Sequence, residues 1–365
     1  MDGNDVKVTK ASTLEETDRK CPKCGGVMDF DPTTGKMLCP FCDYSEEIAV
    51  NNNAPLSAVE MDLESADKTA NCNWGAEKKT IICKSCGAET IYDALEVANE
   101  CPYCGSNQVM PANDENTMAP GGVVPFAITD EQASANFKNW IGKKFFCPKL
   151  AKESARPDSF KGIYLPYWTF DAQTDSKYEA QYGVERQVKT KDHVQTVIDW
   201  YPSKGSFSKF FDDELVIGTN QHDTQMLKCI EPFNTADNKA YKPEYVAGFA
   251  AERYSIGVKD AWLTAKKSIS NKILGGISEK VRKKENSNMV RVKDVQTEFS
   301  ALTYKYLLLP IWCSSFRYNN KVYQFVVNGQ TGKVYGRTPV STIKVIIVIL
   351  CVLLVLGIIF FMMNN

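Results

Sequence analysis

Eight of the 13 cysteines form four Cys-x-x-Cys pairs, a spacing that is typical of metal ligands. The pairs Cys21–Cys24 and Cys39–Cys42 are separated by 14 residues. The pairs Cys83–Cys86 and Cys101–Cys104 are also separated by 14 residues, and each cysteine lies 62 positions after its counterpart. One such turn directs two thiolates at one ion, so two turns complete a tetrahedral shell. The sequence therefore predicts two zinc ions, one for Cys21, Cys24, Cys39 and Cys42 and one for Cys83, Cys86, Cys101 and Cys104.

Two other roles for these pairs, disulfide bonds and redox chemistry, fit the pattern less well. Stable disulfides are uncommon in the cytosol, and a thioredoxin-like motif needs a single pair beside a βαβ unit. Four thiolates leave no open position for water, so both sites are expected to be structural rather than catalytic. Cys72 is out of register with the second set and is interpreted as a spare thiol.

The motifs that usually carry catalysis are missing from the sequence. It contains no GxxxxGK[ST], GxGxxG, GxSxG or HExxH pattern. His193 and His222 lie in polar stretches and are expected in surface loops. The acidic run Asp212–Glu214 could bind a cation, but such a run before a strand is usually only a turn. We expect a protein that is not an enzyme, and a membrane enzyme using Asp212 or Asp213 is the weakest alternative.

The charge is distributed unevenly along the chain. Residues 1–120 contain 10 Lys and Arg against 21 Asp and Glu, whereas the whole chain has a net charge of −1. Residues 20–44 are neutral, and residues 77–105 have a net charge of −2. Phosphate binding requires Lys and Arg, so this distribution argues against nucleic-acid binding by the cysteine units. A nucleic-acid-binding or replication- and transcription-associated role stays the alternative function.

The C-terminal segment has the length and composition of a membrane span. Val345–Met363 is 19 residues without a charge, and a helix of that length covers roughly 28 Å of the ~30 Å hydrocarbon core. Lys333, Arg337 and Lys344 precede the span, and only two asparagines follow it. The positive-inside rule therefore places the N-terminal body in the cytoplasm. We expect a single-pass, tail-anchored protein without a signal peptide.

A basic stretch precedes the span at some distance in the chain. Residues 266–294 contain nine Lys and Arg against three Asp and Glu. This excess fits either the solvated face of a helix or a contact with anionic lipid headgroups.

The elements that carry these motifs indicate an α+β fold. Thr129 and Gln132 have the spacing of a capping box, and apolar residues follow at helical spacing from Ala133 to Ile141. Residues 245–282 are expected to be mostly helical. Strands are predicted at 162–170, 194–200, 214–217, 304–318, 321–327 and 332–336. Leu165–Trp168 is echoed 144 residues later by Leu309–Trp312, which suggests an internal repeat.

These observations suggest a modular chain. Its predicted parts are a flexible N-terminus (1–19), zinc ribbon 1 (20–44), a linker (45–76), zinc ribbon 2 (77–105), a linker (106–122), a β-rich α+β domain with the internal repeat (123–340) and a transmembrane helix (343–363).

The chain resembles a bacterial family of TFIIB-type zinc-ribbon-containing proteins with a C-terminal membrane anchor. The resemblance covers nearly the whole chain and is carried by the paired cysteine units and by segments such as KGIYLPYWTFDA, PEYVAGFAAERY and VYQFVVNGQTGKVYG. Some relatives are labelled primosomal helicases, but this chain lacks helicase motor motifs. The resemblance implies a membrane scaffold whose protein partners are SPFH (flotillin-like) or phage-shock-type envelope-stress proteins. Only the eight zinc ligands carry over as site residues.

Overall fold

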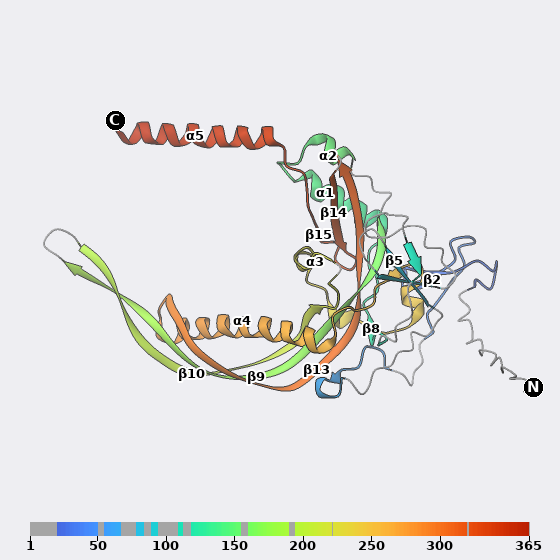
Figure 1. Cartoon of the computed structure of the whole chain (residues 1–365), viewed down its shortest axis with the longest axis horizontal. Coiled ribbons are helices and arrows are strands. Elements are labelled where there is room, and N and C mark those ends of the chain that lie inside the picture. Colours follow the sequence, from blue (N-terminus) through green and yellow to red (C-terminus); the bar gives the residue numbers. More distant parts are fainter. Residues whose placement is uncertain are drawn as a thin grey trace, which may run out of the picture.

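The computed structural model describes residues 20–49, 55–66, 78–83, 89–93, 109–111, 118–154, 160–189, 194–220, 222–319 and 321–364 (Figure 1). Its N-terminal part contains short strands, namely β1 (Asp29–Asp31), β2 (Lys36–Leu38), β3 (Ser45–Glu46), β4 (Met61–Asp62), β5 (Lys78–Cys83), β6 (Glu89–Asp93) and β7 (Val109–Pro111). The helices of the remainder are α1 (Asp130–Gly142), α2 (Lys149–Ser154), α3 (Thr224–Ile230), α4 (Val258–Glu285) and α5 (Thr342–Asn364). The strands of the remainder are β8 (Gly122–Val123), β9 (Lys161–Lys189), β10 (Val194–Ile217), β11 (Lys239–Ala240), β12 (Ala250–Ala251), β13 (Met289–Tyr318), β14 (Lys321–Asn328) and β15 (Val334–Gly336). The described residues form an α+β fold in which sheet predominates.

Three long antiparallel strands give the molecule its shape. β9 pairs with β10 on one side and with β13 on the other, and together they form a curved arm that projects from the body (Figure 1). The segments predicted as separate strands at 194–200 and 214–217 are both part of the single strand β10.

The burial pattern of β9 changes where the strand leaves the body. Residues 163–172 are all buried, because the body covers both faces of the sheet there. From residue 172 to residue 180 buried positions recur at every second residue, which is the pattern of a sheet covered on one face. We call residues 173–189, 194–210 and 289–300 the arm.

Helix α4 lies along the arm and supplies that cover (Figure 1). Its buried side chains recur every four residues, and they are Ala261, Ala265, Ile269, Ile273, Ile277 and Val281. They pack against the arm residues Tyr178 and Ala180 and against Phe211, the residue of β10 that follows the arm. The helix ends at Asn286, which adopts the left-handed conformation with φ 48°.

The prediction of a helix over 245–282 was wrong in its first part. Residues 243–246 form a single 3-10 turn, and Ala250–Ala251 is the short strand β12. Gly248 has φ 79° between them, a conformation that an α-helix does not contain. Apolar periodicity alone did not reveal this break.

The body buries both faces of its sheet. On one face Trp168, Tyr304 and Tyr306 belong to a large aromatic cluster. On the other face, residues of α3 such as Leu227 and Ile230 cover the strands. The predicted capping box is confirmed, since the Gln132 N–H donates to the Thr129 hydroxyl and the Thr129 N–H donates to the Gln132 side chain.

The two segments of the predicted repeat lie side by side. Leu165 of β9 is directly opposite Leu309 of β13. The carbonyl of Pro166 accepts a hydrogen bond from Gly218 N–H, and the carbonyl of Pro310 accepts one from Gly329 N–H, both at 2.8 Å. These matching contacts agree with a repeat, which itself stays a prediction.

Part of the stretch suggested as a first linker contributes to the body. β4 pairs with β13 opposite Thr303 and Tyr304, and Leu63 is buried in the aromatic cluster. β12 pairs with both β9 and β6, which joins the hairpin of β5 and β6 to the large sheet.

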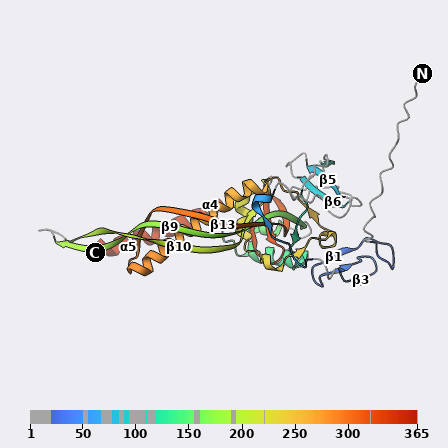
Figure 2. The same cartoon turned by 90° about the horizontal axis from the view of Figure 1, so that it is seen from below.

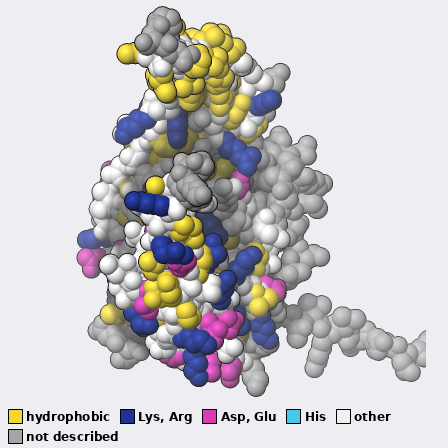
Figure 3. Space-filling view, turned by 90° about the vertical axis from the view of Figure 1, so that its left-hand side faces the viewer, with side chains coloured by type: hydrophobic (Ala, Val, Ile, Leu, Met, Phe, Trp, Pro, Cys, Tyr) yellow, Lys and Arg dark blue, Asp and Glu magenta, His cyan; other side chains and the backbone are white. Residues whose placement is uncertain are grey.

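Helix α5 is long and apolar enough to cross a membrane. Within it, Thr342–Phe360 has a mean hydropathy of 3.3, and none of these side chains is buried against the rest of the described chain. Figure 3 shows apolar side chains gathered over α5 at one end of the molecule, with Lys and Arg side chains on the face below. In Figures 1 and 2 the helix and the arm leave the body on the same side.

Candidate metal centre

The four sulfurs of the first cysteine set meet at one point. Their Sγ atoms all lie within 4.8 Å of one another, and the closest pairs, Cys21–Cys42 and Cys24–Cys39, are 3.5 Å apart. Four sulfurs placed ~2.3 Å from a central zinc ion would be roughly 3.8 Å apart, so the observed spacing suits a tetrahedral metal site. None of these four cysteines is in a disulfide. The cluster can therefore hold a metal ion.

The two turns that present the sulfurs share one backbone geometry. Gly25 follows the first pair with φ 75°, and its N–H donates to the carbonyl of Cys21 at 2.8 Å. Asp43 follows the second pair with φ 58°, and its N–H donates to the carbonyl of Cys39 at 3.0 Å. Aspartate tolerates this left-handed conformation better than most residues, so the departure from glycine at position 43 leaves the turn intact.

The local hydrogen bonds favour a thiolate at Cys21. Burial raises the pKa of this thiol, but bonds from the backbone N–H groups of Lys23 and Cys24 and the contact with Cys42 outweigh it and lower the pKa to about 7. The backbone of Tyr44 also favours the charged form at Cys42, yet burial and the neighbouring sulfurs raise the pKa of that thiol to about 12. Four such sulfurs repel one another as anions unless a cation neutralises them, which is the requirement of a metal site.

The unit formed by residues 20–49, which we call the first cysteine unit, packs on the body. Met28, Phe30 and Met37 share a small buried cluster with Ala247. The N–H of Phe30 donates to the carbonyl of Ala247 at 3.2 Å, and its ring meets Tyr245 at a centroid distance of 5.9 Å. The unit is therefore held against the segment that precedes α4.

Most of the second predicted site lies outside the described residues. Cys86, Cys101 and Cys104 fall there, as do Cys72 and His193. Cys83 is the last residue of β5 and pairs with Val109 of β7. A second four-cysteine site stays a prediction.

The acidic run Asp212–Glu214 sits at a bulge where the arm joins the body. The pairing of β10 with β9 shifts between Phe211 and Glu214, and Asp213 has φ 50°. β13 bulges on the other side of the same region, between Ser300 and Thr303. The extra residues bend the strands and bring Asp213 toward Asp171 of β9.

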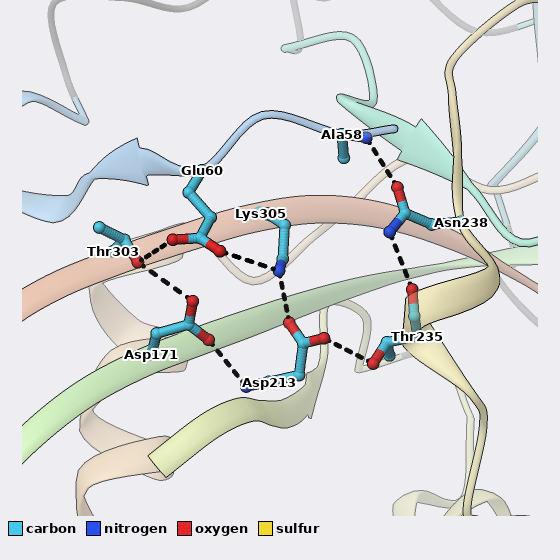
Figure 4. Close-up of polar contacts among 8 residues, drawn as sticks. All are labelled: Ala58, Glu60, Asp171, Asp213, Thr235, Asn238, Thr303 and Lys305. Carbon is cyan, nitrogen blue, oxygen red and sulfur yellow. Dashed lines mark hydrogen bonds and ion pairs between the residues drawn. The ribbon is translucent and has the colours of Figure 1, made fainter. Parts of the chain in front are cut away.

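A lysine pairs with two of the acidic groups at this bulge (Figure 4). Lys305 lies 2.7 Å from the carboxylate of Asp213 and 3.5 Å from that of Glu60. Asp213 also accepts from the Thr235 hydroxyl at 2.6 Å, and its N–H donates to Asp171 at 2.7 Å. Although Asp171, Asp212 and Asp213 are close enough to hold a cation, the ammonium group of Lys305 already supplies one.

The third acidic residue of the run has a separate structural role. The Glu214 carboxylate accepts from the Ser268 hydroxyl at 2.6 Å and from the Lys272 ammonium at 2.5 Å, both on α4. The run is therefore a bulge within β10 that fixes the arm to the body and to α4, and not the turn before a separate strand that the sequence suggested.

Burial and hydrogen bonding shift the pKa values of two aspartates at the bulge in opposite directions. It raises the pKa of Asp171 to about 6, despite the Asp213 N–H and Lys305, which both favour the charged form. At Asp213 burial also raises the pKa, but the hydrogen bonds from Lys305 and Thr235 outweigh it and leave the pKa below its usual value.

His222 does not lie free in a surface loop. Its Nε2 is 2.7 Å from the carboxylate of Glu252, which is buried and also accepts a hydrogen bond from Thr219. The polar sequence around His222 gave no sign of this partner, because Glu252 lies 30 residues further along the chain.

The chain is similar to a curated bacterial protein. It is 28% identical over 326 residues to the uncharacterized protein YdjG of Bacillus subtilis (strain 168), covering 89% of this chain and 91% of that protein. No protein-family model matches the chain, and no solved structure matches it. The similarity extends over most of both chains.

Proposed function

We propose that the chain is a membrane-anchored zinc-ribbon adaptor that is not an enzyme and that recruits protein partners at the cytoplasmic face of a bacterial membrane. The observation that carries this proposal is α5, whose 19-residue stretch Thr342–Phe360 has a mean hydropathy of 3.3 and none of its side chains buried. An exposed apolar surface of this size is stable in lipid and unstable in water. Lys333, Arg337 and Lys344, which precede the uncharged stretch Val345–Met363, support an orientation with the body in the cytoplasm.

Zinc is the metal proposed for the four-cysteine cluster. Four thiolates in a closed tetrahedral shell are typical of structural zinc. The ion would hold together the first cysteine unit, whose strands are only two or three residues long. Ile91–Asp93 of β6 lies 62 positions after Asp29–Asp31 of β1, which supports a second zinc ribbon built in the same way.

The adaptor role is proposed because the described clusters have structural partners. Asp213 and Glu60 at the bulge pair with Lys305, and the four sulfurs leave no position for a substrate. The resemblance to the zinc-ribbon family suggests SPFH-type or envelope-stress proteins as partners. The cysteine units carry no excess of positive charge, which supports protein rather than nucleic acid as the partner.

A pull-down from gently solubilised membranes tests this proposal. The full chain carrying an affinity tag is compared with a chain that lacks residues 342–365, and the captured proteins are identified by mass spectrometry. We expect the full chain to sediment with membranes and to capture envelope proteins, and the shortened chain to be released. Capture of polymerase, replication proteins or nucleic acid would favour the alternative function.

A further inference from the structure

The loop between α1 and α2, together with the first turn of α2, exposes large apolar side chains. Phe145 is 63% exposed and Leu150 is 70% exposed, and Phe146 beside them is exposed as well. We call residues 143–150 the corner. Cys147 within it is buried, and Ala151 just after it is buried too. The corner is therefore fixed from beneath while its aromatic rings point away from the core.

The corner is attached to the start of α5. The N–H of Ser341 donates to the carbonyl of Phe146 at 2.8 Å. The ammonium of Lys344 donates to the carbonyl of Phe145 at 2.8 Å and to that of Cys147 at 3.0 Å. Figure 1 shows α2 beside the first turn of α5. Wherever α5 enters a bilayer, the corner lies at the point of entry.

The charge around the corner has one sign. Residues 132–152 contain no Asp or Glu, and their five lysines are Lys138, Lys143, Lys144, Lys149 and Lys152. Lys144 lies over the ring of Trp140 at 4.5 Å, and Lys149 is within 3.8 Å of Glu153, both exposed. Aromatic rings next to lysines are typical of segments that lie in the interface of an anionic membrane.

A protein partner would also fit an exposed apolar patch. Two observations favour lipid: the corner is continuous with the membrane helix, and its lysines complement anionic headgroups. The position and the charge of the corner therefore both indicate an anionic lipid surface as the partner of this patch.

We propose that the corner is a membrane-interface anchor, in which Phe145, Phe146 and Leu150 insert among the headgroups of an anionic bilayer and the surrounding lysines contact lipid phosphates. This inference rests on the proposed membrane anchoring by α5. It assigns to the body a lipid-binding surface that is additional to the span.

Tryptophan placed at the corner reports its contact with lipid. The full chain is reconstituted with Phe145→Trp in vesicles that contain phosphatidylcholine brominated on the acyl chain, with or without phosphatidylglycerol. The matched control is Leu56→Trp, because Leu56 is 71% exposed and lies in segment 55–66, on the side of the body opposite α5 in Figure 1. The unsubstituted chain supplies the signal of its six native tryptophans.

We expect the added emission at position 145 to be quenched at least about twofold more than that at position 56, because only the former reaches the acyl boundary. Phosphatidylglycerol should increase this difference, and the added pair Lys143→Gln and Lys149→Gln should reduce the increase. Equal quenching at the two positions, in chains that float with the vesicles, would overturn the inference and leave the membrane anchor standing. Chains that fail to float would overturn the proposed anchoring as well.

Discussion

At the scale of single residues, two clusters of side chains define the chemistry of the described part of the chain, namely the four cysteines of the first unit and the ion network at Asp171. The cysteines of the first unit converge because two turns, each with a left-handed residue directly after the second cysteine, aim their sulfurs at one point. This convergence could be predicted from the spacing of Cys21, Cys24, Cys39 and Cys42. The ion network at Asp171 could not, because Glu60, Asp213 and Lys305 come from three distant segments.

Replacing one buried ligand should empty the first metal site. Cys39→Ser should remove one of the two predicted zinc ions, since a neutral hydroxyl binds zinc much more weakly than a thiolate. Zinc content of the purified chain is measured by atomic emission. Cys147→Ser is the matched control, because Cys147 is equally buried but lies outside the cluster. Equal zinc content in the two variants would contradict the assignment.

Asp171 should make stability depend on pH. Its pKa is raised to about 6 in the folded chain, above the ~3.9 of an unfolded aspartate. The folded state therefore binds the proton more tightly than the unfolded state. The contribution of protonated Asp171 to the free energy of unfolding is fully present below pH ~4 and is lost as pH rises through ~6.

The variant Asp171→Asn should remove the loss of folding stability that the ionisation of Asp171 causes as pH rises. Asparagine keeps an oxygen that can accept the Asp213 N–H and avoids a buried charge, so we expect the free energy of unfolding at pH 7 to rise by on the order of 1–3 kcal/mol. Urea unfolding at pH 4.5 and pH 7 measures it. Asp175→Asn on the exposed face of the same strand should change neither value, and a destabilised Asp171→Asn at pH 7 would show that the charged form is favoured instead.

At the scale of elements, local signals predicted the short-range structure well. The capping box at Thr129 and the apolar face of α1 are confirmed because both depend on residues within one helix. The arm was not predicted, since β9 and β13 pair across more than 100 residues. The segment before α4 was wrongly expected to be helical because its apolar residues pack against the first cysteine unit, a contact that lies outside the local sequence.

Two neighbouring glycines in α4 provide a test of its packing. A Cβ at Gly275 would meet nothing within 4 Å, whereas one at Gly276 would lie 2.5 Å from the ring of Phe207. Gly275→Ala should stabilise the helix by up to about 1 kcal/mol. Gly276→Ala should lose that gain, because the ring must move. Thermal unfolding of the two variants checks the order, and an equal rise in Tm would mean that α4 does not contact β10 as described.

At the scale of the whole molecule, the first cysteine unit and the body have separate cores that touch. The small cluster around Met28 and Phe30 meets the body at Ala247, while α4 and the arm share another cluster. The sequence indicated the separate units, but it contained no signal for the surface that joins them.

Removing the metal should therefore have a limited effect. Chelation is expected to unfold residues 20–49 and to loosen residues 245–249, because the metal supplies much of the folding free energy of so small a unit. The amides in the middle of α4 should stay protected from exchange. Among the described residues, Ile269 and Ile273 pack only in the cluster that α4 forms with the arm. Hydrogen exchange with and without a chelator measures this, and loss of protection in α4 would show that the body depends on the metal.

The shared direction of α5 and the arm has a consequence for how the molecule sits in a cell. β9 has 29 residues and extends on the order of 90 Å, and its tip carries the exposed pair Arg186–Asp199, which cannot enter hydrocarbon. Under the membrane anchoring proposed above, α5 would therefore cross the bilayer at a steep angle to the arm. The arm would then lie parallel to the membrane surface, beside the point where α5 enters the bilayer. When the molecule rotates about α5, the arm would stay at a constant distance from the lipid surface. Its encounters with other membrane proteins would therefore be confined to two dimensions.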